Sequence, residues 1–180
     1  MILALAGRRV DAEKTEQPAF PTKNVAVVRQ RVKKLLRSAG ATALVSSAAC
    51  GADLVALEAA GALGIRRRVV LPSEPAVFLK TSVADRPGNW PEIYARTVQE
   101  VSAQGDLVVV HGLGEGDAAY EAANERILEE ALSLAGPSGP ADVLAVLVWN
   151  GPRKGPDVTA SFANAARRRK IKVVEIATDA

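Results

Sequence analysis

The sequence predicts an α/β fold, a three-layer sandwich with helices on both faces of a mostly parallel sheet of about six strands. Three observations predict it. Short apolar runs alternate along the chain with longer segments rich in Ala, Leu and Glu, the pattern of alternating strands and helices. Hydrophobic residues make up 48% of the chain and aromatic residues only 4%, so the core is built mainly from aliphatic side chains. A chain of 180 residues can bury one substantial core, and we expect a single domain over residues 1–180.

The first strand and the first helix are separated by a long polar segment. Residues 2–6 form a continuous apolar run that ends at Gly7, as in a central strand of a parallel sheet. Residues 8–21 are polar, contain two prolines and are expected to form a loop. Apolar residues then recur at helical spacing over residues 22–38, where a Ser-Ala-Gly sequence is expected to end the helix.

The second and third strands flank an Ala-rich helix. Residues 42–46 are a short apolar run and are predicted to be the second strand. The segment from Gly51 to Gly64 carries leucines at helical spacing. Residues 66–71 are predicted to be the third strand, because they end in an apolar run closed by proline.

The middle of the chain carries a long connection before its next helix. Residues 73–90 are expected to hold one short helix near residues 77–82. A helix is predicted over residues 91–103, because proline is well suited to a first helical position. Residues 106–110 are predicted to be the fourth strand, and the glycine-rich residues 111–116 an exposed turn.

The last third of the chain contributes two helices and two strands. Residues 117–135 are predicted to be a long helix, and residues 136–140, which are rich in Pro and Gly, a loop. Residues 143–149 form the fifth apolar run. A helix over residues 157–170 and a final strand over residues 171–176 complete the pattern.

Strands separated by helices pair in parallel through right-handed crossovers. Ligands of such sheets bind beyond the carboxyl ends of the strands. The loops that follow the first, second, third and fifth strands are therefore the ones to search for a binding site.

Composition limits the partners and the compartment. A formal net charge of +3 is too small to indicate nucleic acid, and no basic patch is interleaved with aromatic residues. A single cysteine excludes an intramolecular disulfide and fits a reducing compartment. No apolar run approaches the length of a membrane span. We expect a cytoplasmic protein without a membrane partner, and the Ala-rich helix 117–135 could support a homodimer.

The turn after the second strand is the strongest candidate for binding an anion. Small residues lead there from a strand into a helix, which places backbone N–H groups and the positive end of the helix dipole together. Ser47 could donate a hydrogen bond to phosphate, and Gly51 permits close approach. Asp53 would either cap the helix or bind a ribose hydroxyl. Cys50 belongs to the same candidate site, although a small buried residue is its simpler interpretation.

The turn after the first strand adds Gly7, Arg8 and Arg9. Glycine allows a ligand to approach the backbone, and arginine can hold phosphate through two parallel N–H bonds. Two solvated surface arginines are the alternative. Because the pair follows a central strand directly, we favour ligand contact.

Further candidates lie toward the end of the chain. Asn124 interrupts an Ala-, Leu- and Glu-rich helix and could hydrogen-bond into the cleft. Trp149 could stack on a base or close the core, and Asn150 follows it. Gly155 and Thr159 flank a helix start that could form a second anion site. No Cys, His and Asp cluster has metal-ligand spacing, and neither a metal nor a cofactor is implied. The residues point to no catalytic group.

Several stretches together resemble the SLOG superfamily. The stretches are Ala6-Gly7-Arg8-Arg9-Val10-Asp11, Ser47-Ala48-Ala49-Cys50-Gly51-Ala52-Asp53 with Glu58, Val69-Val70-Leu71-Pro72 with Phe78 and Ser82, Tyr120-Glu121-Ala122-Ala123-Asn124 and Val148-Trp149-Asn150-Gly151. This superfamily groups Rossmann-like domains that include the Lonely Guy phosphoribohydrolases and DNA-processing protein A. Within the superfamily, the chain resembles the bacterial branch that is found alone or beside signalling domains. The resemblance implies a Rossmann-like fold and a nucleotide or nucleotide-derived ligand, held between Gly7, Ser47, Gly51 and the loop after Trp149.

The sequence departs from the Lonely Guy pattern at its catalytic block. Those enzymes carry Pro-Gly-Gly-x-Gly-Thr-x-x-Glu, whereas this chain has lost the glycine pair and carries Phe162 in place of the catalytic Glu. We therefore expect nucleotide binding, as in a sensor module, rather than that hydrolysis. The alternative is an enzyme that cleaves a nucleotide N-glycosidic bond with another carboxylate, such as Glu58 or Glu121.

Overall fold

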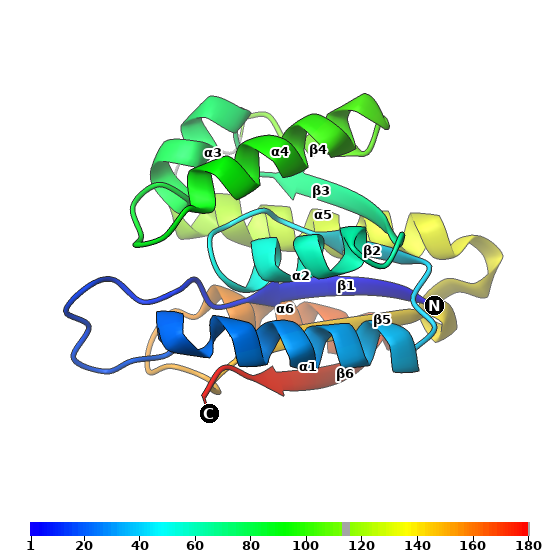
Figure 1. Ribbon diagram of the computed structural model, residues 1–180. Helices are drawn as coiled ribbons and strands as arrows, with labels where there is room; N and C mark the ends of the chain where they lie inside the picture. The colour runs from blue at the N-terminus through cyan, green and yellow to red at the C-terminus, as the bar shows by residue number, and fades with distance from the viewer. Residues whose placement is uncertain (113–115, 180) are drawn as a thin grey trace.

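The computed structural model describes residues 1–112 and 116–179, which form one α/β domain (Figure 1). Its sheet has six strands in the order β4-β3-β2-β1-β5-β6, and every neighbouring pair is parallel. The predicted fold class is confirmed. The strands are β1 (Ile2–Gly7), β2 (Ala43–Ser46), β3 (Arg66–Leu71), β4 (Leu107–Val109), β5 (Val143–Trp149) and β6 (Lys172–Ala177).

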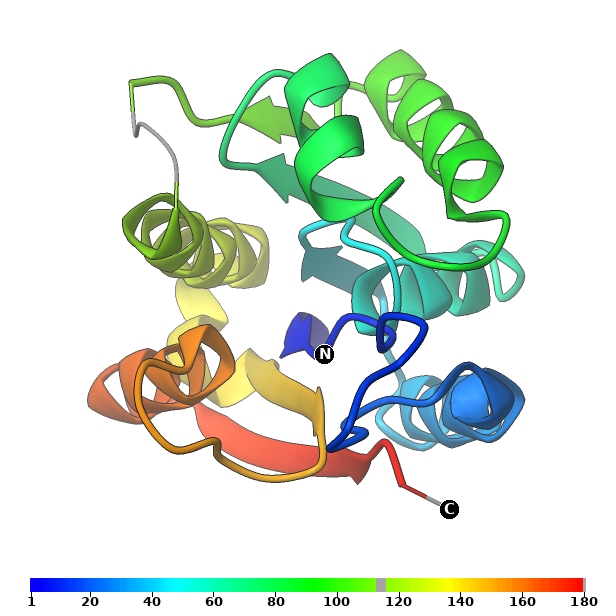
Figure 2. The same ribbon diagram turned by 90° about the vertical axis from the view of Figure 1, so that its left-hand side faces the viewer.

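Helices cover both faces of this sheet, as the end-on view of Figure 2 shows. One face packs against α1 (Val25–Ser38), α2 (Ala52–Gly61), α3 (Pro75–Ser82) and α4 (Trp90–Ala103). The other face packs against α5 (Asp117–Ala135) and α6 (Val158–Arg168).

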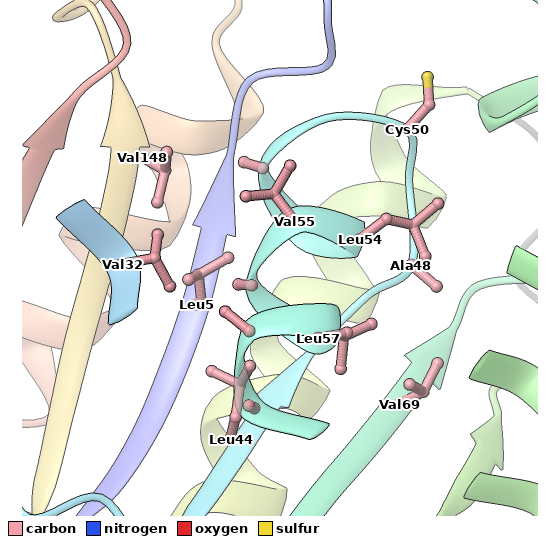
Figure 3. Close-up of a cluster of buried hydrophobic side chains, with 14 of the residues drawn as sticks. Leu5, Val32, Leu44, Ala48, Cys50, Leu54, Val55, Leu57, Val69 and Val148 are labelled. Atoms are coloured by element: carbon pink, nitrogen blue, oxygen red, sulfur yellow. The ribbon is translucent and has the colours of Figure 1, made fainter. Parts of the chain in front are cut away.

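Alternating side chains of the strands feed the two cores. Leu3 and Leu5 of β1 belong to the core beneath α1 and α2, while Ile2 and Ala4 belong to the core beneath α5 and α6. Because both faces are covered, the central strands β1, β2 and β5 are buried and largely apolar on both sides rather than alternating apolar with polar. Figure 3 shows the first of these cores, where Leu54 and Leu57 of α2 pack above the sheet.

Many of the predicted element bounds shift by a few residues in the structure, and two of the differences have a clear local cause. The helix predicted over residues 157–170 begins one residue later, because Asp157 is its N-cap and accepts hydrogen bonds from the amides of Thr159 and Ala160. Residues 136–140 are not a plain loop but part of a 3-10 segment, η2 (Gly136–Asp142). The fixed φ of proline suits such a helical turn. A second 3-10 segment, η1 (Thr22–Asn24), leads into α1. In the predicted turn 111–116, residues 113–115 lie outside the described residues.

The strand order creates a switch point between β1 and β5. The chain that leaves β1 continues to α1 on one face, whereas the chain that leaves the neighbouring β5 continues to α6 on the other face. Loops that diverge from adjacent strands leave a crevice at the carboxyl edge of the sheet, where ligands of doubly wound folds bind.

Candidate functional site

A cavity of about 470 Å³ lies at this carboxyl edge. Its volume falls in the range of small-molecule sites. Seven of the residues predicted for the site line it: Gly7, Arg8, Arg9, Ser47, Asp53, Asn124 and Thr159. The other five are not part of its lining: Cys50, Gly51, Trp149, Asn150 and Gly155.

Arg8 spans the switch point. Its guanidinium donates to both carboxylate oxygens of Asp157, from Nη1 at 2.8 Å and from Nη2 at 2.7 Å. Nη2 also donates to the carbonyl of Gly151 at 2.7 Å. The guanidinium lies 5.6 Å from the centre of the Trp149 ring, within the range of a cation–π contact. Arg8 is only 6% exposed, so it joins β1 to the loop after β5 rather than reaching into solvent.

Asp157 is the main residue that sequence reasoning missed. Besides Arg8, it accepts hydrogen bonds from the amides of Arg153 at 2.8 Å, Thr159 at 3.0 Å and Ala160 at 3.2 Å. Burial alone would raise the pKa of Asp157, but Arg8 and the amides outweigh burial and lower that pKa to about 2. An aspartate before a predicted helix is a recognisable N-cap, yet its pairing with Arg8 is a tertiary contact that no local pattern reveals.

Two buried polar atoms in residues lining the cavity have no hydrogen-bond partner among the described residues. They are Nε of Arg8 and Oγ of Ser47. A buried polar atom without a partner is costly, and such atoms in a cavity wall mark places where a ligand can supply the missing bond. Ser47 as a residue is partly exposed, so a rotation about its Cα–Cβ bond can redirect the hydroxyl.

Asp53 provides a carboxyl group in the cavity wall with an unusual proton affinity. Its Oδ2 accepts a hydrogen bond from the amide of Ala49 at 3.2 Å, and no cation in the described part of the chain pairs with it. Burial raises the pKa of Asp53 to about 7, against a smaller lowering by the Ala49 amide. The side chain therefore changes charge near neutral pH.

The turn after β2 uses several of its own N–H groups. The amide of Ala49 donates to Asp53, that of Cys50 to the carbonyl of Ser82 at 3.1 Å, and that of Ala52 to the carbonyl of Arg8 at 3.0 Å. An anion at this turn would have to rely on its remaining amides.

Cys50 and Trp149 lie in the cores beside the cavity. Cys50 is fully buried, and burial raises the pKa of its thiol to about 11. Its side chain points away from α2 (Figure 3). Trp149 is 6% exposed, packs in the core beneath α5 and α6, and donates from Nε1 to Glu175 at 2.9 Å. These positions favour the simpler interpretation of each residue, a small buried cysteine and a tryptophan that closes the core.

Arg9 lies nearer the mouth of the cavity. Its guanidinium contacts both carboxylate oxygens of Asp85, at 2.8 and 3.0 Å. Arg86 donates to the same carboxylate at 2.7 Å and to the carbonyl of Val10 at 3.1 Å. Arg86 also lines the cavity and was not predicted. These contacts tie the loop after β1 to the segment that follows α3.

Polar side chains from α3 and α5 meet at another part of the cavity wall. Oγ of Ser82 and the hydroxyl of Tyr120 lie 2.6 Å apart, and both residues line the cavity. One turn further along α5, Nδ2 of Asn124 donates to the carbonyl of Val158 at 2.9 Å. The helical spacing of Asn124 from Tyr120 is visible in the sequence. The contact between Ser82 and Tyr120, in contrast, joins elements that are far apart in the chain.

The two carboxylates considered for hydrolysis lie outside this cavity. Glu58 of α2 pairs with Arg29 at 3.0 Å and with Arg96 at 2.8 Å. Glu121 lines a smaller hollow of about 170 Å³ and accepts a hydrogen bond from Ser161 at 3.0 Å. Phe162, in the place of the catalytic Glu, is fully buried in the core.

The described residues contain neither a membrane-spanning helix nor a metal-binding cluster. Among them, no helix is both long and apolar enough to cross a bilayer. In the same residues, no group of three or more His, Cys, Asp and Glu side chains is arranged to hold a metal ion.

Comparisons with known proteins support the fold of the chain. No protein-family model matches the chain, and no curated protein matches its sequence. The structure is similar to that of DNA processing protein A from Streptococcus pneumoniae, with a TM-score of 0.57 and 14% sequence identity. The match covers 96% of this chain and 49% of that chain, so this chain spans about half the length of that protein. The likeness shows a shared Rossmann-like fold, in agreement with the sequence prediction.

Proposed function

We propose that the protein binds a nucleotide or nucleotide-derived ligand in the cavity at the carboxyl edge of the sheet. The observation that carries this proposal is the coincidence of the cavity with the unpartnered atoms of Arg8 and Ser47. A ligand with several hydrogen-bonding groups would satisfy them, and a volume of about 470 Å³ suits a molecule of nucleotide size. The position of the cavity at a topological switch point gives further support.

Calorimetric titration with nucleoside phosphates, ADP-ribose and cyclic nucleotides tests the proposal, with Ser47→Ala as the informative variant. Because Oγ of Ser47 has no hydrogen-bond partner among residues 1–112 and 116–179, its removal should leave thermal stability unchanged or slightly higher. Affinity should fall by about five- to tenfold, the worth of one hydrogen bond. Ser102→Ala, on the exposed face of α4, is the matched control and should bind as the wild type does. No binding by any member of the panel would refute the proposal.

A second candidate function is hydrolysis of a nucleotide N-glycosidic bond, and Asp53 is the observation that favours it. A carboxyl group with a pKa of about 7 can donate a proton to a leaving base near neutral pH. Water would add to the sugar carbon as the base departs with that proton. The added water would lose one proton to solvent, and the Asp53 carboxylate would take one up again. Without chemistry at the bound ligand, the protein would instead act as a sensor module.

Incubation of the purified protein with nucleoside monophosphates separates these two functions. The enzyme hypothesis requires release of free base and ribose phosphate, abolished in Asp53→Asn. Glu58→Gln, which lies outside the cavity and among arginines, is the control and should retain the wild-type rate. Retained affinity without any release of base would leave the binding function alone.

A further inference from the structure

The donor groups around Asp157 are those that would suit a ligand's anion. The Arg8 guanidinium presents two terminal nitrogens, at 2.8 and 2.7 Å from the two carboxylate oxygens. The amides of Arg153, Thr159 and Ala160 approach the same carboxylate at the start of α6. An arginine fork combined with amides at a helix N-terminus is a common arrangement for holding phosphate. Here a carboxylate of the protein fills it.

The Asp157 carboxylate remains ionised and paired with these donors. The side chain of Asp157 is 3% exposed, and its pKa of about 2 keeps it ionised at any ordinary pH. Because it is attached to the chain beside its donors, it competes with an effective concentration on the order of millimolar or higher. A ligand phosphate would have to displace it and leave it unpaired in a nearly dry environment.

The remaining charges of the cavity do not favour an anion either. Its described lining contains four arginines and four aspartates. The formal charges cancel when Asp53 is ionised, and a single positive charge remains when Asp53 is protonated. Arg9 and Arg86 also share the carboxylate of Asp85. Such a lining produces at most a weak net positive field to draw a phosphate in.

Hydrogen-bonding groups outside the ion pairs, in contrast, remain available in the lining. Oγ of Ser47 has no partner. Asn124 uses only Nδ2, toward Val158, and Asp53 uses only Oδ2, toward Ala49. Apolar side chains, among them Val10 and Phe78, complete the walls. This mixture of apolar surface with a few acceptors and donors suits a base and a sugar.

We propose that the cavity recognises its ligand through an uncharged part, the nucleoside, and not through phosphate, because Asp157 already occupies the position of an anion. The inference rests on the proposed nucleotide-binding function and deepens it. It differs from the phosphate-holding turn that the sequence suggested.

The first test compares the four common ribonucleosides with their 5′-monophosphates on the wild-type protein. We expect each nucleoside to bind within tenfold of its monophosphate, with affinities that change less than about threefold between 50 and 500 mM salt, since little charge pairing is screened. A monophosphate that binds more than tenfold tighter than its nucleoside would overturn the inference. Absence of binding by both series would refute the proposed function instead.

The second test needs no nucleotide and examines by itself whether Asp157 occupies the anion position. Asp157→Ser keeps a good N-cap residue but vacates the place of the carboxylate. Inorganic phosphate should raise the melting temperature of Asp157→Ser and leave that of the wild type unchanged. The control is Asp142→Ser, whose carboxylate pairs with the N-terminal amine at the opposite end of β5, and phosphate should not protect it.

Protection of the wild type by phosphate would show that the anion position is open and would overturn the inference. If Asp157→Ser does not fold, the wild-type protein still decides the inference, through the comparison of nucleosides with monophosphates and through its own response to phosphate.

Discussion

Gly51 and Arg9 face each other in an isolated antiparallel bridge. The bridge binds the turn after β2 to the chain that leaves β1, through hydrogen bonds from the amide of Val10 to the carbonyl of Cys50 and from the amide of Ala52 to the carbonyl of Arg8. The two turns that sequence reasoning treated as neighbouring parts of one site are thus a single backbone unit.

Replacement of Gly51 by Ala should therefore be strongly destabilising. Gly51 has a φ of 113°, and a Cβ there would lie 2.6 Å from the Val10 amide nitrogen and 2.7 Å from the Arg8 carbonyl oxygen. Backbone strain and the clash together should lower the free energy of unfolding by about 2–5 kcal/mol, measured by urea denaturation. Gly64→Ala is the control: φ is 67° and nothing lies within 4 Å of the new Cβ, so only about 1 kcal/mol should be lost. Equal losses in the two variants would contradict the packing argument.

Arg8 and Asp157 should be strongly coupled in stability. Arg8→Met leaves the Asp157 carboxylate buried without its cation, and such single removals cost about 3–5 kcal/mol. The double variant Arg8→Met/Asp157→Leu leaves no unpaired charge, so its loss should be well below the sum of the two single losses. Denaturation of all four proteins gives the coupling energy.

The same pair predicts an acid limit to stability. The pKa of Asp157 is lowered from 3.8 to about 2 in the folded protein, so its contribution is present above pH 3.8 and is lost as the pH falls toward 2. If the losses of the two single variants add up in the double variant, the coupling between Arg8 and Asp157 is contradicted. If the double variant, which carries Asp157→Leu, unfolds in acid at the same pH as the wild type, the pair does not set the acid limit.

Asp53 should have the opposite effect on the pH dependence. The pKa of its carboxyl is raised from 3.8 to about 7, so the folded protein retains a proton that the unfolded chain releases, and stability falls as the pH rises from about 4 to 7. Asp53→Asn should therefore be more stable than the wild type at pH 8, by up to about 4 kcal/mol at 1.36 kcal/mol per pKa unit. The two proteins should have similar stability at pH 4, which serves as the internal control. A difference that is independent of pH would exclude this role for Asp53.

The contact between Ser82 and Tyr120 should contribute modestly to stability. Tyr120→Phe removes the hydroxyl that lies 2.6 Å from Oγ of Ser82 and should lower the free energy of unfolding by about 1 kcal/mol. Thr81 Oγ1 lies 3.3 Å from Ser82 Oγ, so Ser82 keeps a partner in the variant. In Ser82→Ala, the further change Tyr120→Phe should have almost no effect, and an undiminished loss there would show that the two hydroxyls act independently.

The fold was largely predictable because it depends on local and periodic signals. The strands predicted over residues 66–71 and 143–149 have those bounds in the structure, and the helix predicted over residues 117–135 is α5. Each of these segments ends at a glycine, a proline or a polar residue that acts locally. The 3-10 segment η2 (Gly136–Asp142) was missed because its prolines suit a loop as well as a tight helical turn.

The candidate site was predictable only where residues follow strand ends directly. Gly7, Arg8 and Ser47 meet at one cavity because parallel strands end at a common edge. The partners that decide their chemistry could not be predicted, because Asp157 reaches Arg8 from the far end of the chain. The absence of a cation beside Asp53 likewise depends on the packed structure rather than on its neighbours in sequence.

The pairing of β1 on both edges has a consequence for how the protein is made. Leu3 of β1 pairs with Leu44 of β2 on one side and with Leu144 of β5 on the other. During synthesis on the ribosome, β1 can pair with β2 early, but its other edge stays unpaired until β5 and most of the chain have emerged. The nascent protein therefore exposes an unpaired, hydrophobic strand edge for much of its synthesis. Shielding by a chaperone would be of most value during that interval.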